Sequence, residues 1–388
     1  CTPSTVVAAT RTGFQVNGVN RYQWKALLNL LPDTEYCYRV YLGSLDLLAG
    51  DASPRFITQV PPGSSKPFTF AVFGDWGSTD TSGENPDQAK VMQQIAASGA
   101  RFALTTGDNG YSSGSQNNYG DLLQSGSAMS GVFGPSFWTV PGRSMALFPA
   151  MGNHGFARSD TNHPHFVNWP EDRAVALSAG SYQRVNYCCE FGTSGNLPAT
   201  YYAFSVGNAR FYVLHAAWAD TQIGTASGPY EVDAAYNWRP GTPQYEWLEN
   251  DLATHDEPVK FAVLHYPMYS DQKHETSDTF LQGPGSAEEL LGQHGVQFLL
   301  NGHAHIYQRN AANAYGTVSY VTGGGGATTQ SIGEDPCIAL DQFGIGWSNS
   351  SSTGNACGAA TPPTAPLQVY HYLKIQVDGS IVTVTPVD

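Results

Sequence analysis

Five apolar runs of strand length each end in side chains of the kinds that bind metal ions. The runs cover residues 68–73, 102–106, 147–151, 259–265 and 296–300. Helix signals lie between several of them, so strands alternate with helices along the chain. This order predicts an α/β fold in which the residues that follow the strands gather at one edge of a sheet.

Three helices are predicted from their start signals. Asn85 is a candidate N-cap because Pro86 follows it at the first helical position. A second helix is expected from Thr242 onward, where a proline again follows the cap. A third begins at the capping box formed by Ser286 and Glu289.

Two hairpins are predicted from turn residues between apolar runs. Residues 201–206 and 211–215 flank Gly207-Asn208, and the last segment, 369–387, folds back about Asp378-Gly379. The 388 residues suffice for one large domain and a small one.

The N-terminal segment has the pattern of a small β domain. Strands are expected at residues 10–19, 22–28, 36–42 and 55–59. The stretch 30–36 has the pattern L-x-P-x-T-x-Y, which resembles the tyrosine corner of fibronectin type III domains. Because residues 60–67 have a linker composition, we predict a fibronectin type III-like all-β domain at 1–62, a linker at 63–67 and the main domain at 68–388. A β extension of the main domain is the alternative.

Charge and hydropathy exclude several classes of partner. The formal net charge is -14, which repels nucleic acids and anionic membranes, so we expect no nucleic-acid partner. The sequence contains no run of 18 or more apolar residues, and we expect no membrane insertion. If the ligand is an anion such as a phosphate, its attraction must come from a local cationic centre, which points to bound metal.

The six cysteines suit an oxidising compartment. None forms a C-x-x-C pair, and an even count in a chain poor in lysine favours disulfides. Cys1–Cys37 and Cys337–Cys357 are the preferred pairs, which leaves adjacent Cys188 and Cys189 for a vicinal bridge or as free thiols. The chain begins at Cys1 without an initiator methionine, which we interpret as a processed or trimmed form. We expect a secreted protein, extracellular or periplasmic.

Seven side chains at the strand ends are the candidate metal ligands. They are Asp75, Asp108, Tyr111, Asn153, His265, His303 and His305. Each motif alone is weak, because Gly-Asp is common turn chemistry and His-x-His occurs in polar loops. Together, four oxygen ligands and three imidazoles supply a mixed set that suits two hard-to-borderline metals.

The order of these motifs resembles the metallophosphoesterase superfamily. GDxG at 74–77, GDxxY at 107–111, GNH at 152–154, a strand-end histidine followed by x-Pro, and GHxH at 302–305 occur in that order. Tyr111, three residues after Asp108, is similar to the tyrosine of the purple acid phosphatase branch. The resemblance implies a four-layer α/β/β/α sandwich preceded by a small all-β domain.

The resemblance also implies a role for each ligand in a dinuclear centre. The expected ligands of a ferric ion are Asp75, Tyr111 and His305. The expected ligands of a divalent ion (zinc, iron or manganese) are Asn153, His265 and His303. Asp108 is expected to bridge the two ions, which would activate a hydroxide for attack on phosphorus.

Three further histidines are candidates around the metals. His154, next to Asn153, is similar to the outer histidine of the family and is the expected general acid and substrate contact. His274, nine residues after His265, falls where plant relatives carry substrate-contacting histidines, although an exposed loop histidine is an equal alternative. His215 also ends a strand, so it is a candidate substrate-binding residue beside the site. Gly155 departs from the family, where many relatives carry an acid.

The leading hypothesis is a secreted acid phosphatase that hydrolyses small phosphate monoesters. A phosphodiesterase of the same superfamily is the first alternative. A secreted binding protein with a non-catalytic metal site is the second, although structural sites are usually closed and need no outer acid. The oligomeric state stays open.

Overall fold

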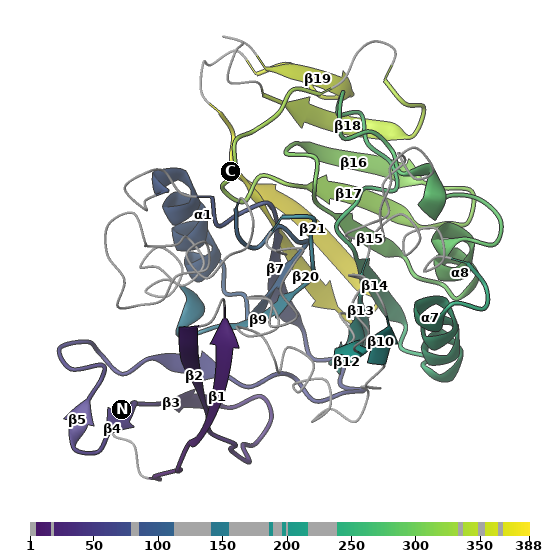
Figure 1. The fold of residues 1–388 in the computed structure, drawn as a ribbon. Coiled ribbons are helices and arrows are strands. Elements are labelled where there is room, and N and C mark those ends of the chain that lie inside the picture. Colours follow the sequence, from purple (N-terminus) through teal and green to yellow (C-terminus); the bar gives the residue numbers. More distant parts are fainter. Residues whose placement is uncertain are drawn as a thin grey trace.

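Two β-sheets form the centre of the molecule (Figure 1). The structure is a computed structural model that describes residues 5–16, 19–78, 85–111, 141–154, 186–188, 196–198, 201–215, 239–332, 337–347, 354–363 and 368–388. The first sheet has five strands in the order β21 (Ile381–Val387), β20 (Tyr372–Asp378), β7 (Phe68–Phe73), β8 (Phe102–Thr105) and β9 (Ala146–Pro149). The second has eight, in the order β12 (Tyr202–Val206), β13 (Ala209–Val213), β14 (Val259–Val263), β15 (Phe298–Asn301), β17 (Val318–Thr322), β16 (Tyr307–Ala312), β18 (Asp341–Gly346) and β19 (Asn355–Gly358).

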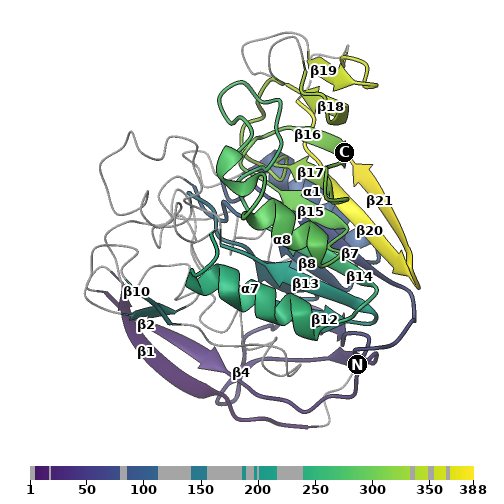
Figure 2. The same ribbon diagram turned by 90° about the vertical axis from the view of Figure 1, so that its right-hand side faces the viewer.

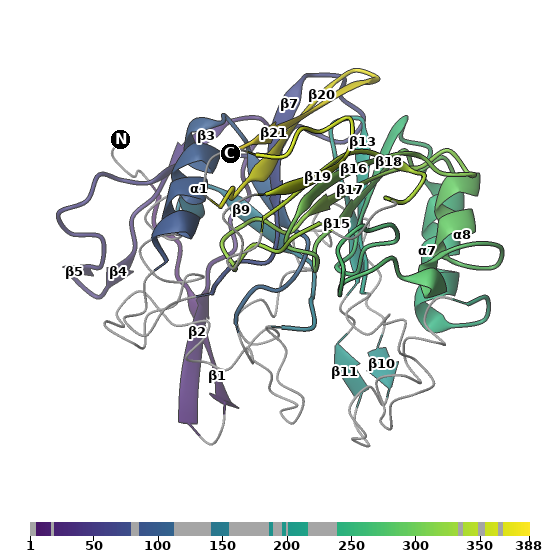
Figure 3. The same cartoon turned by 90° about the horizontal axis from the view of Figure 1, so that it is seen from above.

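Helices cover the outer face of each sheet. Helix α1 (Pro86–Ala97) lies on one side of the sheet pair, and α7 (Pro243–Thr254) and α8 (Ala287–Gln293) lie on the other (Figure 3). Figure 2 shows α7 and α8 side by side across the larger sheet. The molecule therefore has the predicted α/β/β/α order of layers.

Three apolar clusters fill the spaces between the four layers. Aromatic rings dominate the cluster between the sheets, where Phe70 and Phe102 stack with ring centroids 5.2 Å apart. A second cluster packs the larger sheet against α7 and α8, through residues such as Leu248 and Leu291. The third packs α1 against the smaller sheet, with Met92 fully buried. Burial of this apolar surface is the main force that holds the layers together.

The helix signals are confirmed with one difference. Asn85 caps α1, and its side chain accepts a hydrogen bond from the Gln88 N–H at 3.0 Å. Helix α8 begins after Ser286 as predicted, but the capping box does not form. The Ser286 hydroxyl instead donates to the Leu281 carbonyl at 2.9 Å, and Glu289 accepts from the Gly285 N–H at 2.8 Å. The preceding loop therefore competes successfully for both side chains.

Both predicted hairpins are present. Strands β12 and β13 pair antiparallel across Gly207-Asn208, and β20 and β21 pair across Gly379-Ser380. Gly207 and Gly379 have φ values of 56° and 59°, which glycine adopts at little cost.

The N-terminal segment is all β in its described part, as two-stranded pairs. The pairs join β1 (Thr10–Val16) to β2 (Val19–Lys25), β3 (Glu35–Cys37) to β6 (Arg55–Ile57), and β4 (Tyr41–Leu42) to β5 (Leu45–Asp46). The Leu31 N–H donates to the Tyr36 hydroxyl at 3.0 Å, which is the bond expected at a tyrosine corner. The fibronectin type III-like topology itself stays a prediction, as do the domain boundaries.

The chain leading into the predicted linker contacts the main sheets. Val60 is buried in the cluster between the sheets, and the Gly63 N–H donates to the Gly207 carbonyl at 2.7 Å. Arg101 forms an ion pair with Asp33 at 2.7 Å, which joins the segment to the loop before β8. The N-terminal segment is therefore held by both apolar and polar contacts.

One predicted disulfide is confirmed. Cys337 and Cys357 are bonded, with Cα atoms 5.9 Å apart. Cys37 is disulfide-bonded, and its predicted partner Cys1 lies outside the described residues. The side chains of Cys188 and Cys189 also lie outside them. A short pair, β10 (Asn186–Cys188) with β11 (Asn196–Pro198), lies in that part of the chain.

Candidate metal centre

The carboxyl ends of strands from both sheets meet at one edge of the molecule. In the smaller sheet β7, β8 and β9 run parallel, and in the larger sheet β13, β14, β15 and β17 do. Parallel strands end at the same edge, so the residues that follow them lie close together. All seven candidate ligands occupy these loops.

Three of the candidate ligands have a left-handed backbone. Asp75, Asp108 and His303 have φ values of 56°, 50° and 67°. They are three of the four non-glycine residues with positive φ in the described part of the chain. Such strain concentrates at functional sites, and here it turns each chain sharply after its strand.

Glycines next to the ligands leave no room for a side chain. A Cβ atom at Gly107 would lie 2.5 Å from Nδ1 of His265, and one at Gly152 would lie 2.1 Å from Oδ1 of Asp108. The motif glycines are therefore needed for close approach of the loops.

Tyr111 is the centre of the first group of ligands. Its hydroxyl lies 2.8 Å from Oδ2 of Asp108, 3.3 Å from Oδ1 of Asp75 and 3.0 Å from Nε2 of His305. His305 Nε2 also lies 3.3 Å from Asp75 Oδ1. These contacts bring together the three residues expected to bind the ferric ion.

Asn153 is the centre of the second group. Its Oδ1 lies 2.8 Å from Nε2 of His265 and 3.1 Å from Nδ1 of His303. The rings of His265 and His303 are 5.1 Å apart. These are the three residues expected to bind the divalent ion.

Asp108 joins the two groups through its two oxygens. Oδ2 accepts from Tyr111, whereas Oδ1 lies 3.1 Å from Nε2 of His265. Its carboxylate is 1% exposed and therefore directed inward. The structure thus places Asp108 where a bridging ligand is expected.

Backbone carbonyls orient two of the three imidazoles. His265 Nδ1 lies 2.9 Å from the Thr106 carbonyl, and His305 Nδ1 lies 2.5 Å from the Thr328 carbonyl. A carbonyl only accepts, so each Nδ1 carries the proton. In the neutral form of both rings, Nε2 is then the nitrogen with a lone pair, directed at the cluster.

A buried asparagine fixes the loops of the smaller sheet. Asn109 accepts from the Trp76 indole at 2.9 Å and from the Thr105 hydroxyl at 2.7 Å, and it donates to the Ala150 carbonyl at 2.7 Å. One side chain therefore ties together the loops after β7, β8 and β9.

The charges in the cluster are strongly coupled. Burial alone would raise the pKa of Asp108, but the charge and hydrogen bond of His265 hold that pKa well below its usual range. Burial disfavours protonated His265, yet Asp108 raises the pKa of His265 to about 9. Burial, followed by the charges of Asp108 and Asp75, raises the pKa of Tyr111 well above its usual value. Without a cation, the phenol therefore stays protonated and donates to Asp108.

The donor set fits a pair of metal ions. Asp75, Asp108 and His305 offer ligand atoms that all lie within 4.8 Å of one another. Two buried carboxylates beside a phenol are costly unless positive charge compensates them. A bound cation would also lower the pKa of the Tyr111 phenol, because it stabilises the phenolate. The mixed oxygen and nitrogen ligands suit iron, zinc or manganese.

The outer histidines differ in their relation to the cluster. The His154 N–H donates to Oδ1 of Asp108 at 2.7 Å, and its ring lies 4.7 Å from the ring of Tyr111. His215 is buried beyond the end of β13, in register with His265 beyond β14, because Val213 pairs with Val263. His274 is exposed, and within the described part of the chain no hydrogen bond or ion pair joins its side chain to the cluster. The roles of these three residues stay predictions.

One contact of the cluster was missed by the sequence analysis. Glu275 Oε2 lies 2.6 Å from Nε2 of His303. Glu275 follows no strand and lies in none of the five motifs, so only its position next to His274 could have pointed to it.

The glycine run 323–326 packs tightly behind the site. The Gly325 N–H donates to the Gly74 carbonyl and the Ala327 N–H to the Asp75 carbonyl, at 2.9 and 2.8 Å. A Cβ atom at Gly324 would lie 2.2 Å from Nδ1 of His371. The run therefore supports the Asp75 loop.

A four-layer sandwich with such a cluster at its edge is the architecture of a metallophosphoesterase. The family model described as calcineurin-like phosphoesterase matches residues 68–307, and the chain belongs to this family. The match covers every candidate ligand.

Curated relatives include plant purple acid phosphatases. Probable purple acid phosphatase 20 of Arabidopsis thaliana is 24% identical over 290 residues, which is 72% of this chain and 53% of the relative. Purple acid phosphatase 21 of the same plant is 27% identical over 292 residues, 72% of this chain and 51% of the relative. The chain thus spans about half the length of these relatives.

Solved structures support the fold. The purple acid phosphatase PPD1 from yellow lupin seeds superposes with a TM-score of 0.58 at 17% identity, covering 98% of this chain and 66% of that one. The structure of PhoD gives a TM-score of 0.50 at 13% identity, with 95% of this chain and 80% of that chain covered. Among the described residues, no helix combines the length and apolar character needed to span a bilayer.

Proposed function

We propose that the protein is a dinuclear metal hydrolase of the purple acid phosphatase type, acting on small phosphate monoesters. The observation that carries the proposal is Asp108, whose two oxygens face two separate groups of ligands. The plant relatives, named as purple acid phosphatases, support the assignment.

Each side chain has a role in this proposal. The residues that would hold a ferric ion are Asp75, Tyr111 and His305. The residues that would hold a zinc, iron or manganese ion are Asn153, His265 and His303. Asp108 would contact both ions, since its two oxygens face the two groups of ligands.

A bound metal pair would supply an acidified water and positive charge for the phosphoryl group. The protein supplies the orientation of the ligands and a proton donor. His154 lies over Tyr111 and is anchored to Asp108 by its backbone N–H, so its imidazole stands at the edge of the cluster. We assign it the protonation of the leaving alcohol, a function worth typically about 10²–10⁴-fold in rate.

Localisation is part of the proposal. The Cys337–Cys357 disulfide supports an oxidising compartment, as expected for an extracellular or periplasmic enzyme. Small phosphate esters are the proposed substrates, because the -14 net charge opposes binding of a polyanion.

Substitution of Asp108 tests the function. Asp108→Ala should lose both metals and p-nitrophenyl phosphate turnover, because neither ion retains its shared ligand. Asp256→Ala, which removes an exposed carboxylate from the loop after α7, is the control and should keep both. Full turnover by a metal-free Asp108→Ala protein would contradict the proposal, and a metal-loaded wild type without turnover would favour a binding protein.

One observation favours phosphodiesters as the alternative substrates. The carboxylate of Glu275 lies beside the second ligand group and repels a dianionic monoester more than a monoanionic diester. The ratio of kcat/KM for mono- and bis-p-nitrophenyl phosphate distinguishes the two, and a higher value for the diester would replace the monoester proposal.

A further inference from the structure

One histidine of the second ligand group, His303, is held by a carboxylate. Nε2 of His303 lies 2.6 Å from Oε2 of Glu275, while Nδ1 of the same ring lies 3.1 Å from Oδ1 of Asn153. The two ring nitrogens therefore face different side chains, Nε2 the carboxylate and Nδ1 the amide oxygen. Because a carboxylate accepts, it favours a proton on Nε2. Nδ1, which faces the Asn153 oxygen, is then the nitrogen that would give its lone pair to a cation.

The loop that carries Glu275 is internally fixed. Asp271 and Thr276 form an antiparallel bridge, and the Ser270 N–H donates to the Ser277 hydroxyl at 2.9 Å. The Gln272 side chain accepts from the backbone N–H groups of both His274 and Glu275. A side chain on such a loop loses little further entropy when it binds His303.

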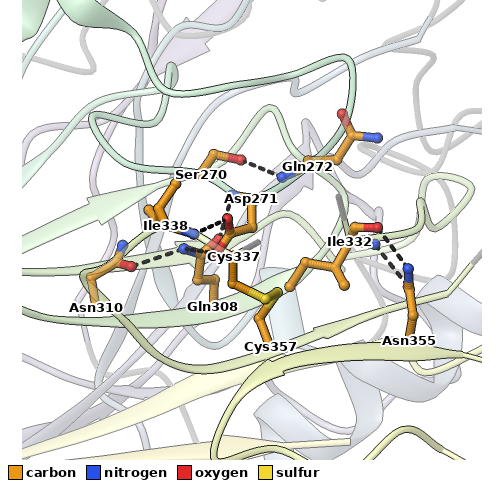
Figure 4. Close-up of a disulfide and its surroundings, with 10 residues drawn as sticks. All are labelled: Ser270, Asp271, Gln272, Gln308, Asn310, Ile332, Cys337, Ile338, Asn355 and Cys357. Atoms are coloured by element: carbon orange, nitrogen blue, oxygen red, sulfur yellow. Dashed lines mark hydrogen bonds between the residues drawn. A yellow bond between two sulfur atoms is a disulfide. The ribbon is translucent and has the colours of Figure 1, made fainter. Parts of the chain in front are cut away.

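The same loop is anchored to the larger sheet (Figure 4). The Asp271 N–H donates to Oε1 of Gln308 at 2.9 Å, and Oδ1 of Asp271 accepts from the Ile338 N–H at 2.7 Å. Ile338 directly follows Cys337, whose disulfide to Cys357 fixes this chain segment. Glu275 is therefore positioned by the body of the protein.

Glu275 distinguishes His303 from the other two imidazoles. His265 and His305 donate to the neutral carbonyls of Thr106 and Thr328. Only His303, among these three, has a carboxylate as its outer partner. A carboxylate makes the imidazole a stronger ligand than a carbonyl does.

We propose that Glu275 is a positioning residue that tunes the divalent-metal position selectively. It holds His303 with the proton on Nε2, so that Nδ1 is available as the ligand, and it adds negative charge beside that position. The ferric position, whose histidine is oriented by a carbonyl, is not under its control. This inference rests on the proposed dinuclear centre.

Two variants and a control test the inference. Glu275→Ala removes the acceptor, Glu275→Gln keeps an amide oxygen that accepts from Nε2–H, and Glu249→Gln changes an exposed carboxylate of α7. The iron and divalent-metal content of each purified protein is measured by mass spectrometry, and the divalent Kd by competition with a chromophoric chelator.

We expect Glu275→Ala to raise the divalent Kd about 10- to 100-fold, the usual effect of losing an outer partner of a metal-bound histidine. Glu275→Gln should show a smaller increase, and Glu249→Gln none. Iron content and the unfolding temperature of the metal-free protein should match the wild type, which a general loss of structure would not allow.

An unchanged divalent Kd in Glu275→Ala would overturn this inference and leave the proposed function intact. Equal loss of iron and divalent metal would also overturn it, because the effect would not be selective. A wild type that binds no metal pair is a different result, since it removes the proposed function together with the inference.

Discussion

At the residue scale, the candidate ligands are held in costly conformations. Asp75, Asp108 and His303 have left-handed backbones, at about 1–3 kcal/mol each. Hydrogen bonds compensate part of this cost, because the His303 N–H donates to the Asp75 carboxylate and the His154 N–H to that of Asp108. The loops therefore stabilise one another as well as the site.

A buried carboxyl pair away from the cluster should make stability depend on pH. Both oxygens of Asp341 are buried, and burial followed by the hydrogen bond and charge of Asp271 raises the pKa of Asp341 to about 7. Its ordinary value is 3.8, so the folded protein binds more protons than the unfolded chain between about pH 4 and 7. This group therefore lowers the free energy of unfolding as the pH rises through that window.

Asp341→Asn should remove this dependence, because the amide donates to Asp271 without titrating. The free energy of unfolding, from urea titrations at pH 5 and pH 8, should decline less in the variant than in the wild type. The stability difference between the two proteins should therefore shift in favour of the variant at pH 8. Asp256→Asn, at an exposed position, serves as the control. Parallel pH profiles for wild type and Asp341→Asn would contradict the assignment.

At the element scale, the strand ends were the predictable part of the site. Residues 68–73 form β7 as predicted, and Asp75 follows where expected. The same holds for the loops after β8, β9, β14 and β15, because apolar periodicity locates buried strands well. Glu275 and the lost capping box at Ser286 were not predictable, since both depend on contacts made by loops.

The disulfide next to β18 and β19 should stabilise the edge of the larger sheet. Cys337 and Cys357 are 20 positions apart, and a loop of that size is worth about 3 kcal/mol in chain entropy. The double variant Cys337→Ala/Cys357→Ala should lower the free energy of unfolding by about this amount. Its divalent Kd should also rise, because Ile338 anchors the Glu275 loop.

Urea unfolding and the chelator titration measure the two effects separately. Unchanged stability would show that the bond does not constrain the sheet edge, and weaker stability with an unchanged divalent Kd would show that the loop is anchored by other contacts.

At the scale of the whole molecule, the site depends on the two sheets packing face to face. The cluster between them, centred on Phe70, Phe102 and Phe211, sets the distance between the loops of the two sheets. Asp75, Asp108, Tyr111 and Asn153 come from the smaller sheet, and the three histidines from the larger one. The motifs in the sequence predicted which residues would cluster, whereas their division between the two sheets required the packing.

The central claim is that these seven side chains hold two metal ions that share Asp108. Anomalous diffraction from a crystal of the metal-loaded protein tests it most directly. We predict two peaks about 3.5–4 Å apart, on either side of the Asp108 carboxylate, the spacing usual in two-metal sites. A single peak, or peaks remote from Asp108, would contradict the account.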